Sequence, residues 1–430
     1  ERARASVALI VTGGIGPNPE GAIQAHAAVL NKPEQVAQHQ IITQAVHNEG
    51  SKICLQILHT GRYAYNPKLV APSAIQAPIN RFVPHELTGA EIEQQIQDFV
   101  NCAALAQQAD YDGVEIMGSE GYFLNEFIAK RTNHRSDEWG GAYKNRIRFP
   151  IEVVRRVREK VGTHFIIIFR LSMLDLVEQG STLEEIIQLG QAVEQAGATI
   201  INTGIGWHEA RIPTIATKVP RAAFTWATHK VRQSLKIPVI TSNRINMPAV
   251  AEAVLMRGDA DMVSMARPFL ADPEFMLKAD QGRSTDINTC IACNQACLDH
   301  IFVGKPATCL VNPRACNEQD LVISSTQQPK KLAVVGAGPA GLAFAVTAAQ
   351  RGHQVTLYDA NTEIGGQFNL AKQIPGKEEF NETLRYFKHQ LEKHGVSLRL
   401  GQLVTPAELE ATDAEEIILA TGINPRVPTI

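Results

Sequence analysis

The chain has 430 residues, of which 44% are hydrophobic and 20% charged, and its formal net charge is −3. This length is too great for one ordinary core and predicts two or three domains, while the composition is typical of a globular protein. The small negative charge excludes the basic field that nucleic-acid binders use, and no apolar run approaches the roughly 18 residues of a membrane span. We therefore expect a cytoplasmic monomer that binds neither nucleic acid nor membrane and acts on a small-molecule substrate.

From residue 1 to about residue 283 the sequence repeats one unit, a short β-branched run followed by a loop and an amphipathic helix. Near-continuous apolar runs are typical of parallel strands covered on both faces. The alternation predicts an α/β fold, a (β/α)8 TIM barrel whose first strand is missing from this chain. A doubly wound open sheet is the alternative. The expected strands are Val7–Gly14, Lys52–Leu58, Gly113–Gly118, Phe165–Ser172, Thr199–Gly204, Pro238–Asn243 and Met262–Arg267.

In a TIM barrel the functional side chains gather at the C-terminal ends of the strands. Arg244 and Arg267 would follow the last two strands, where such barrels usually bind phosphate, and two guanidinium groups suit a phosphate dianion. They predict flavin mononucleotide (FMN), with Gln56 and Arg170 at the polar edge of its ring. Alternatively, each arginine caps a strand end through an ion pair. The candidate cofactor-binding residues at these ends are Gly14, Gln56, Arg170, Arg244, Ala266 and Arg267.

Four of the seven cysteines lie within twenty residues, at the spacing C-x2-C-x3-C-x11-C. In a cytoplasmic protein, thiolates this dense are more typical of a metal site than of disulfides. An iron–sulfur cluster suits three close thiolates and one remote one, whereas zinc usually uses two C-x2-C knuckles. We expect a [4Fe–4S] cluster in the segment 284–325, with zinc or a buried apolar cysteine cluster as the alternatives. The predicted metal ligands are Cys290, Cys293, Cys297 and Cys309.

A polar linker at 326–330 precedes a sequence pattern that is typical of a nucleotide-binding βαβ unit. An expected strand, Lys331–Val335, is followed by the turn G-A-G-P-A-G, whose glycines are Gly336, Gly338 and Gly341. Glycines at this spacing allow backbone N–H groups at a helix N-terminus to approach a pyrophosphate. A second expected strand ends before Asp359, at the distance where an acidic residue binds a ribose hydroxyl.

Several longer stretches are shared with a known family, among them GVEIMGSEGYFLNEF at 113–127, GIGWHEARIP at 204–213 and DMVSMARPFL at 261–270. With these stretches the chain resembles the old yellow enzyme family, and its cysteine spacing resembles the iron–sulfur flavoprotein branch. The resemblance covers essentially the whole chain. It implies an FMN barrel at 1–283, the cluster at 284–325, and at 326–430 the first part of a Rossmann-like domain for flavin adenine dinucleotide (FAD), with Gln367 near the FAD. It also implies an NADPH domain that this chain lacks, so we expect a piece of a longer protein.

The resemblance further implies the NADPH-dependent reduction of 2,4-dienoyl-CoA to 2-enoyl-CoA in the β-oxidation of unsaturated fatty acids. Electrons would pass from NADPH to FAD, to the cluster, to FMN and finally to the substrate. Tyr122 holds the family's position for the proton donor. Met117 and Glu120 replace two residues with which the broader family holds a substrate carbonyl, so His208 becomes the candidate that binds the thioester oxygen.

Two arginines and two other functions stay open. Arg131 and Arg211 would contact either the phosphates of CoA or neighbouring carboxylates, and Glu120 would pair with a nearby arginine. The alternative functions are those of a sister flavoenzyme, either an enoate reductase or an amine dehydrogenase, and of a non-catalytic electron-transfer scaffold with zinc in place of the cluster. An amine dehydrogenase would favour an aromatic cage for a cation, and the strand ends show no aromatic cluster beyond Tyr122 and Trp207.

Overall fold

The computed structural model describes residues 1–423 and divides the chain into two compact units. The first unit contains Glu1–Ile215 and Arg221–Met265, and the second contains Ala216–Pro220 and the chain from Ala266 onward. Each unit has its own hydrophobic core. The three-part division by cofactor, with limits at 283 and 325, stays a prediction, and the last seven residues of its third part lie outside the described residues.

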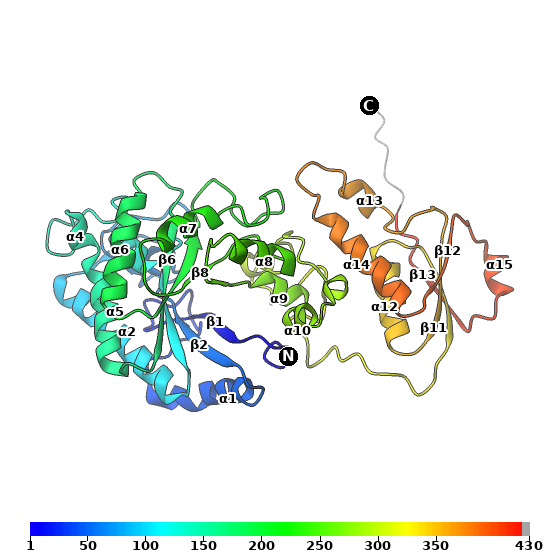
Figure 1. Cartoon of the computed structure of the whole chain (residues 1–430), viewed down its shortest axis with the longest axis horizontal. Coiled ribbons are helices and arrows are strands. Elements are labelled where there is room, and N and C mark those ends of the chain that lie inside the picture. Colours follow the sequence, from blue (N-terminus) through cyan, green and yellow to red (C-terminus); the bar gives the residue numbers. More distant parts are fainter. Residues whose placement is uncertain (424–430) are drawn as a thin grey trace. The chain divides into compact units, whose positions relative to one another are not determined.

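A parallel sheet of seven strands forms the centre of the first unit (Figure 1), in the strictly sequential order β1-β2-β5-β6-β7-β8-β9. This order is typical of a (β/α) barrel and excludes the doubly wound sheet, whose order reverses at a switch point. The sheet curls but stays open, since β1 and β9 do not pair in the described part of the chain. The strands are β1 (Leu9–Ile15), β2 (Lys52–Ile57), β5 (Gly113–Gly118), β6 (Ile166–Leu174), β7 (Ile200–Ile205), β8 (Val239–Thr241) and β9 (Met262–Val263).

Helices between successive strands cover the outer face of this sheet (Figure 1). The helix α2 begins where Thr88 accepts a hydrogen bond from the N–H of Glu91, and Thr182 caps α6 in the same way. Both are capping boxes, which satisfy N–H groups that a helix start leaves without partners. The core lies between these helices and the strands. The helices are α1 (Val36–His47), α2 (Gly89–Gln108), α5 (Arg148–Val161), α6 (Leu183–Gln195), α7 (Thr225–Arg232) and α8 (Pro248–Met256).

The last two expected strands end earlier than predicted. β8 stops at Thr241, and the following Asn243 and Arg244 have φ angles of +71° and +59°, a left-handed conformation that a strand does not allow. β9 stops at Val263, so Ala266 and Arg267 do not end a strand. Instead they begin the short helix α9 (Arg267–Ala271), because Pro268 fixes φ at a value that suits the first turn of a helix.

The second unit contains four parallel strands in the order β12-β11-β10-β13. The predicted strand–turn–helix–strand pattern is confirmed by β10 (Lys331–Val335), α12 (Pro339–Gln350) and β11 (Gln354–Asp359). Between α9 and this sheet lies a segment with little regular structure, which includes the cysteines. No helix among the described residues has both the length and the apolar character needed to cross a bilayer. The remaining main elements are α10 (Phe275–Asp280), α11 (Leu298–Phe302), α14 (Phe380–Lys393), β12 (Ser397–Leu400) and β13 (Glu416–Leu419).

Candidate active site and cofactor-binding sites

Tyr122 and His208, the two predicted catalytic residues, lie side by side in the first unit. Tyr122 caps the N-terminus of α3 (Phe123–Ile128) after β5, and His208 lies in the loop after β7. The hydroxyl oxygen of Tyr122 and Nε2 of His208 are 2.7 Å apart and share a hydrogen bond. The two rings meet edge to face, with their centroids 4.9 Å apart. The C-terminal ends of two strands of one sheet thus bring together residues 86 positions apart.

The surroundings of this pair favour two neutral side chains. Burial, assisted by the negative charge of Glu120, raises the pKa of Tyr122 above its ordinary value. Burial lowers the pKa of His208, although the residue as a whole is partly open to solvent. The charged form of each group is less well solvated near protein atoms than in water. At neutral pH the phenol therefore keeps a proton that it can donate, as a general acid must.

Glu120 lies directly before this pair in a strained conformation. Its φ angle is +61°, in the left-handed region that non-glycine residues rarely adopt, and such strain is typical of functional sites. Its carboxylate accepts hydrogen bonds from Nη2 of Arg170 at 2.8 Å and from Nε at 3.2 Å. The prediction that Glu120 pairs with a nearby arginine is confirmed. Arg170, expected at the flavin ring, is the partner.

A row of polar side chains crosses the middle of the sheet on β2, β5 and β7. Nε2 of Gln56 donates to one carboxylate oxygen of Glu115 at 2.7 Å, and Nδ2 of Asn202 donates to the other at 2.6 Å. Glu115 is only 1% exposed, so the sheet buries a polar side chain at a position where an ordinary core would hold an apolar one. Gly14 lies opposite Gln56 on β1, beyond an irregularity in the register. Amide and carboxylate groups in this row fit the polar edge of a flavin, and their flavin contacts stay a prediction.

The two arginines of the expected phosphate site belong to different units. Arg244 is buried in the first unit, in the strained turn after β8. Arg267 belongs to the second unit, where its Nη1 donates to Oδ1 of Asn294 at 2.6 Å. Ala266 caps the same helix start. The joint binding of an FMN phosphate by Arg244 and Arg267 therefore stays a prediction.

Four residues near the catalytic pair escaped the sequence analysis: Arg62, Tyr63, Glu126 and Glu209. The ring of Tyr63 lies 5.9 Å from that of Tyr122 and 5.7 Å from that of His208, edge to face in both cases. The signal that would have found Arg62 and Tyr63 is their place just after the C-terminal end of β2.

Arg131 and Arg211, the two arginines expected at the substrate, lie in different surroundings. Arg131 donates to Glu209 through Nε at 3.1 Å, which agrees with the expectation of a neighbouring carboxylate. Arg211 is exposed, and no described residue pairs with its guanidinium group.

The glycine turn of the second unit has the shape that a pyrophosphate needs. Gly336 has a φ angle of +109°, and an added Cβ would lie 2.3 Å from the carbonyl oxygen of Ala420. A Cβ on Gly341 would lie 1.8 Å from the carbonyl oxygen of Gly336, so this glycine allows the close packing of helix on strand. A Cβ on Gly338 would meet no heavy atom within 4 Å in the described chain. These are the three glycine roles of a dinucleotide-binding turn, with open space at the second glycine.

Asp359 and Gln367, also predicted at this site, make contacts within the protein. Oδ2 of Asp359 accepts a hydrogen bond from the N–H of Ala337 at 2.6 Å, so the carboxylate fastens the glycine turn. Its predicted contact with a ribose stays a prediction. Gln367 precedes the short helix α13 (Phe368–Ala371), and its Nε2 donates to the carbonyl oxygen of Ile423.

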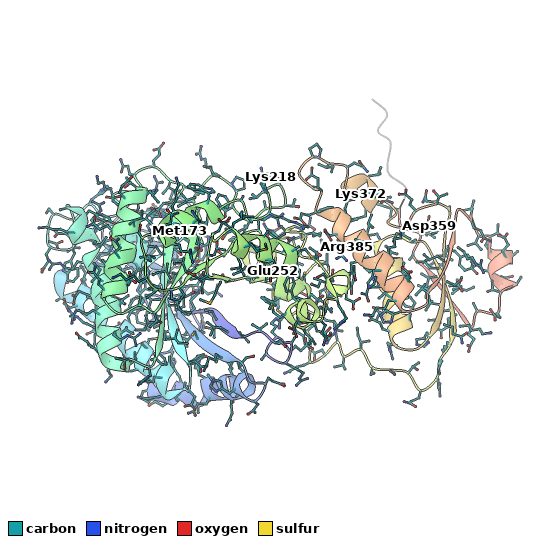
Figure 2. All side chains as sticks on the ribbon, viewed as in Figure 1. Met173, Lys218, Glu252, Asp359, Lys372 and Arg385 are labelled. Carbon is teal, nitrogen blue, oxygen red and sulfur yellow. The ribbon has the colours of Figure 1, made fainter. Side chains whose placement is uncertain are left out.

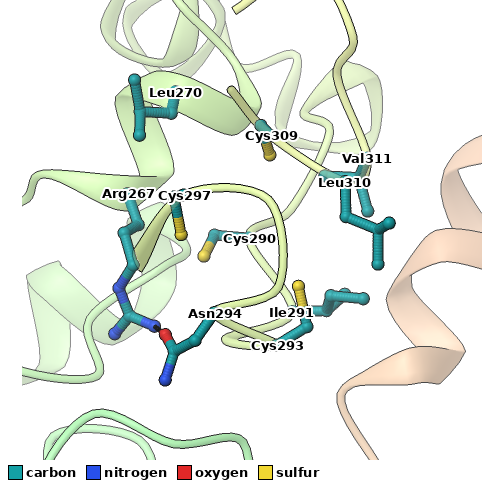
Figure 3. Close-up of a pocket in the computed structure, with 10 residues that line it drawn as sticks. All are labelled: Arg267, Leu270, Cys290, Ile291, Cys293, Asn294, Cys297, Cys309, Leu310 and Val311. Carbon is teal, nitrogen blue, oxygen red and sulfur yellow. Dashed lines mark hydrogen bonds between the residues drawn. The ribbon is translucent and has the colours of Figure 1, made fainter. Parts of the chain in front are cut away.

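The four cysteines with the predicted metal-ligand spacing line one pocket of the second unit (Figure 3). Their sulfur atoms point inward from the loop 290–297 and from the strand-like segment at Cys309. Cys316, which is exposed, is not among the lining residues. The lining residues are Arg267, Leu270, Cys290, Ile291, Cys293, Asn294, Cys297, Cys309, Leu310 and Val311.

The pocket contains four thiols, and the metal that they would hold stays a prediction. Across residues 1–423, no three His, Cys, Asp or Glu side chains lie close enough together to hold one metal ion. Burial, with the neighbouring thiols, raises the pKa of Cys309 to about 12 and also raises the pKa of Cys293. Four facing thiols become thiolates only if a cationic centre compensates their charge. Thiolates around a shared space are the ligand set of a [4Fe–4S] cluster.

Helix α14 holds the segment that leads into this pocket. Arg385, labelled in Figure 2, donates from Nη1 to the carbonyl oxygen of Thr285 and from Nη2 to that of Ile287, each at 2.7 Å. Asp286 between them accepts from His389 and Lys393 of the same helix. The backbone just before Cys290 is therefore fixed to α14 by side chains of both charges.

Comparison with known proteins gives two family matches. Residues 1–286 match the NADH:flavin oxidoreductase / NADH oxidase family, and residues 330–430 match the pyridine nucleotide-disulphide oxidoreductase family. The chain is 39% identical to a metal reductase of Desulforamulus reducens, over all of this chain and 65% of the relative. It is 29% identical to a cinnamate reductase of Clostridium sporogenes, over all of this chain and 69% of the relative. The chain thus spans about two thirds of the length of these curated relatives.

A solved structure agrees with both units. The 2-naphthoyl-CoA reductase, solved as a complex with 2-naphthoyl-CoA, superposes with a TM-score of 0.97 at 33% identity, over all of this chain and 68% of that chain. Because the match covers all of this chain, it includes both units.

Proposed function

The chain belongs to the NADH:flavin oxidoreductase / NADH oxidase family, and from this premise we propose that it reduces a carbon–carbon double bond conjugated to a carbonyl group, with electrons from NAD(P)H. Two relatives support this choice, because cinnamate and 2-naphthoyl-CoA both carry such a bond next to a carboxylate or thioester. An unsaturated carboxylate or acyl-CoA is the substrate class they favour. The more specific 2,4-dienoyl-CoA thioester is one member of that class.

The hydrogen bond between Tyr122 and His208 is the observation that carries the proposal. Reduction of the conjugated bond adds a hydride to one carbon and a proton to the other, and the bound flavin would supply the hydride. Tyr122 holds the proton for the second carbon. If Nε2–H of His208 donates to the phenol oxygen, it leaves the phenolic proton free and stabilises the phenolate that remains. In this tautomer Nδ1 of the neutral imidazole carries no proton, so His208 cannot at the same time donate a hydrogen bond to the substrate carbonyl.

The cofactors follow the residues that fit them. We propose FMN above the polar row of Gln56 and Glu115, FAD at the turn of Gly336–Gly341, and a [4Fe–4S] cluster on the four cysteines. The open space at Gly338 and the shared pocket of the thiols support the last two. NADPH as the electron donor and the electron route through FAD and the cluster to FMN belong to the same proposal.

The test isolates the substrate half-reaction, so it needs no nicotinamide domain. The FMN-loaded chain is reduced anaerobically with dithionite and mixed with cinnamate, an enoyl-CoA or a 2,4-dienoyl-CoA, and flavin reoxidation is followed by stopped flow. We expect reoxidation by at least one of them. Tyr122→Phe should slow it by about 10²–10⁴, the usual contribution of a positioned general acid.

The matched control is Tyr111→Phe. Tyr111 also bonds a histidine through its hydroxyl, Nδ1 of His39 at 2.9 Å, but on the helix side of the sheet unit and outside the catalytic pair. It should leave the rate unchanged. Equal rates for wild type and Tyr122→Phe would assign the proton to another source, and no reoxidation by any of the three compounds would refute the substrate class.

A further inference from the structure

The exposed His208 lies between two buried and anchored neighbours. Trp207 is 3% exposed, and the side chain of Glu209 is also 3% exposed. Nε1 of Trp207 donates to Oδ1 of Asp175 at 2.8 Å, and its backbone N–H donates to the carbonyl oxygen of the same residue at 3.0 Å. The imidazole can therefore move only as far as its two neighbours allow.

Glu209 is anchored by two arginines from other loops. Its Oε1 accepts hydrogen bonds from Nη2 of Arg62 and from Nε of Arg131. The side chain of Arg62 is 2% exposed, while that of Arg131 is 32% exposed. The guanidinium of Arg62 also lies over the rings of Tyr63 and Trp207, at 5.3 Å and 5.7 Å. Arg62 is thus the buried partner of Glu209, and Arg131 is its solvent-exposed partner.

These contacts join the three loops that carry the aromatic site. Arg62 follows β2 together with Tyr63, and its backbone N–H donates to Oε1 of Glu126 on α3 at 2.8 Å. Tyr122 directly precedes α3, and Glu209 follows His208 after β7. Arg62 therefore connects the loops after β2, β5 and β7, through its backbone N–H to Glu126 and through its guanidinium to Glu209.

A buried ion pair of this kind adds little net stability, because removing both charges from water costs about as much as their attraction returns. Its benefit is a unique conformation. We propose that Glu209 is a positioning residue, which holds the loop of His208 so that Nε2 stays at the hydroxyl of Tyr122. The inference rests on the proposed function, since it assigns a role in the same proton-donating pair.

The test replaces Glu209 by Gln, which keeps the side-chain shape and removes the charge that attracts both arginines. In the dithionite-reduced, FMN-loaded chain, the limiting reoxidation rate should fall at least about 10-fold, as expected for a misplaced catalytic group, while the substrate concentration for half-maximal rate changes little. Glu138→Gln is the control, because it removes an exposed ion pair with Arg148 elsewhere in the unit. It should change neither value.

A second readout needs neither flavin nor substrate. The imidazole nitrogen signals of His208, assigned with a His208→Gln variant, report the hydrogen bond to Tyr122 by NMR. They should shift toward those of a free imidazole in Glu209→Gln and, if that variant does not fold, in Arg131→Gln, which keeps the Arg62 pair and should show a smaller shift. Unchanged signals in the folded variants, or an unchanged reoxidation rate in Glu209→Gln, would overturn the inference. If none of the three compounds reoxidises the reduced flavin of the wild type, the proposed function is refuted. The NMR shift then still decides whether Glu209 positions His208.

Discussion

Glu126 shows how a single buried group makes the first unit sensitive to pH. It is fully buried on α3, its Oε2 receives no hydrogen bond from any described residue, and burial raises the pKa of its carboxyl to about 8. The positive charge of Arg62 opposes this shift without cancelling it. A carboxyl group in this position is protonated at neutral pH in the folded protein and ionised in the unfolded chain.

This difference predicts a stability that falls as pH rises. Below about pH 4 both states hold the proton, and between about pH 4.5 and pH 8 only the folded state does. The free energy of unfolding should therefore drop by up to about 1.4 kcal/mol per pH unit across this window and level off above it. Tryptophan fluorescence in urea measures it, because Trp139, Trp207 and Trp226 all lie in the first unit. Glu126→Gln should flatten the slope; an equal slope in the variant would place the titration elsewhere.

At the same scale, the sequence predicted that Tyr122 and His208 act together, and their catalytic roles stay a prediction; it did not indicate the residues that contact their loops. Tyr122 and His208 stood out through a family resemblance, and the structure brings them within hydrogen-bond distance. Arg62 and Glu209 are 147 positions apart, and neither lies in a pattern that local spacing makes visible. An ion pair between distant loops depends on the tertiary fold, so it became visible only once the fold was known.

At the scale of elements, the glycines of the turn before α12 have two different roles, one in the packing of the protein and one in the binding of a nucleotide. Gly341 and Gly336 are required by close contacts within the protein, whereas Gly338 faces open space with an ordinary φ of −74°. The positions of most strands were predictable from the hydropathy of the sequence. Buried parallel strands are continuous apolar runs, but the ends of β8 and β9 depend on left-handed residues and on Pro268, which hydropathy does not report.

Gly341→Ala should therefore lower the stability of the second unit, whereas Gly338→Ala should lower its affinity for FAD. The first drives a Cβ into a backbone carbonyl and should destabilise the second unit by about 3 kcal/mol. The second should leave the melting temperature unchanged and weaken FAD binding, because the methyl group fills the space next to the helix N-terminus. Thermal unfolding and FAD titration of both variants measure the two effects. Full FAD affinity in folded Gly338→Ala would place the pyrophosphate elsewhere.

At the scale of the whole molecule, the pocket of four thiols is the feature that most distinguishes the second unit from a plain nucleotide-binding fold. The spacing predicted which four of the seven cysteines belong together, and the structure places these four around one pocket. It leaves out Cys316, although that residue follows Cys309 by only seven positions. Elemental analysis of the purified protein identifies the metal that these thiols hold.

Anaerobically prepared protein should hold about four iron atoms per chain and absorb in the visible range. Cys309→Ser should lose iron, because it removes one of four ligands, whereas Cys316→Ser should keep it. Elemental analysis together with the absorption spectrum decides between iron and zinc. Stoichiometric zinc without iron in the wild type would refute the cluster, and iron loss in Cys316→Ser alone would reassign the fourth ligand.

The hydrogen bonds from Arg385 to Thr285 and Ile287 determine at which position a chimera of this protein and a relative should be joined. A breakpoint in the polar linker at 326–330 would pair the cysteine loop of one parent with the α14 of another, and the hydrogen bonds before Cys290 would depend on a chance match. A breakpoint between Met265 and Ala266, where the main part of the second unit begins, transfers the loop and its helix together. Chimeras cut there inherit an intact thiol pocket, so the cysteine segment is exchanged with the nucleotide-binding module and not with the sheet that precedes it.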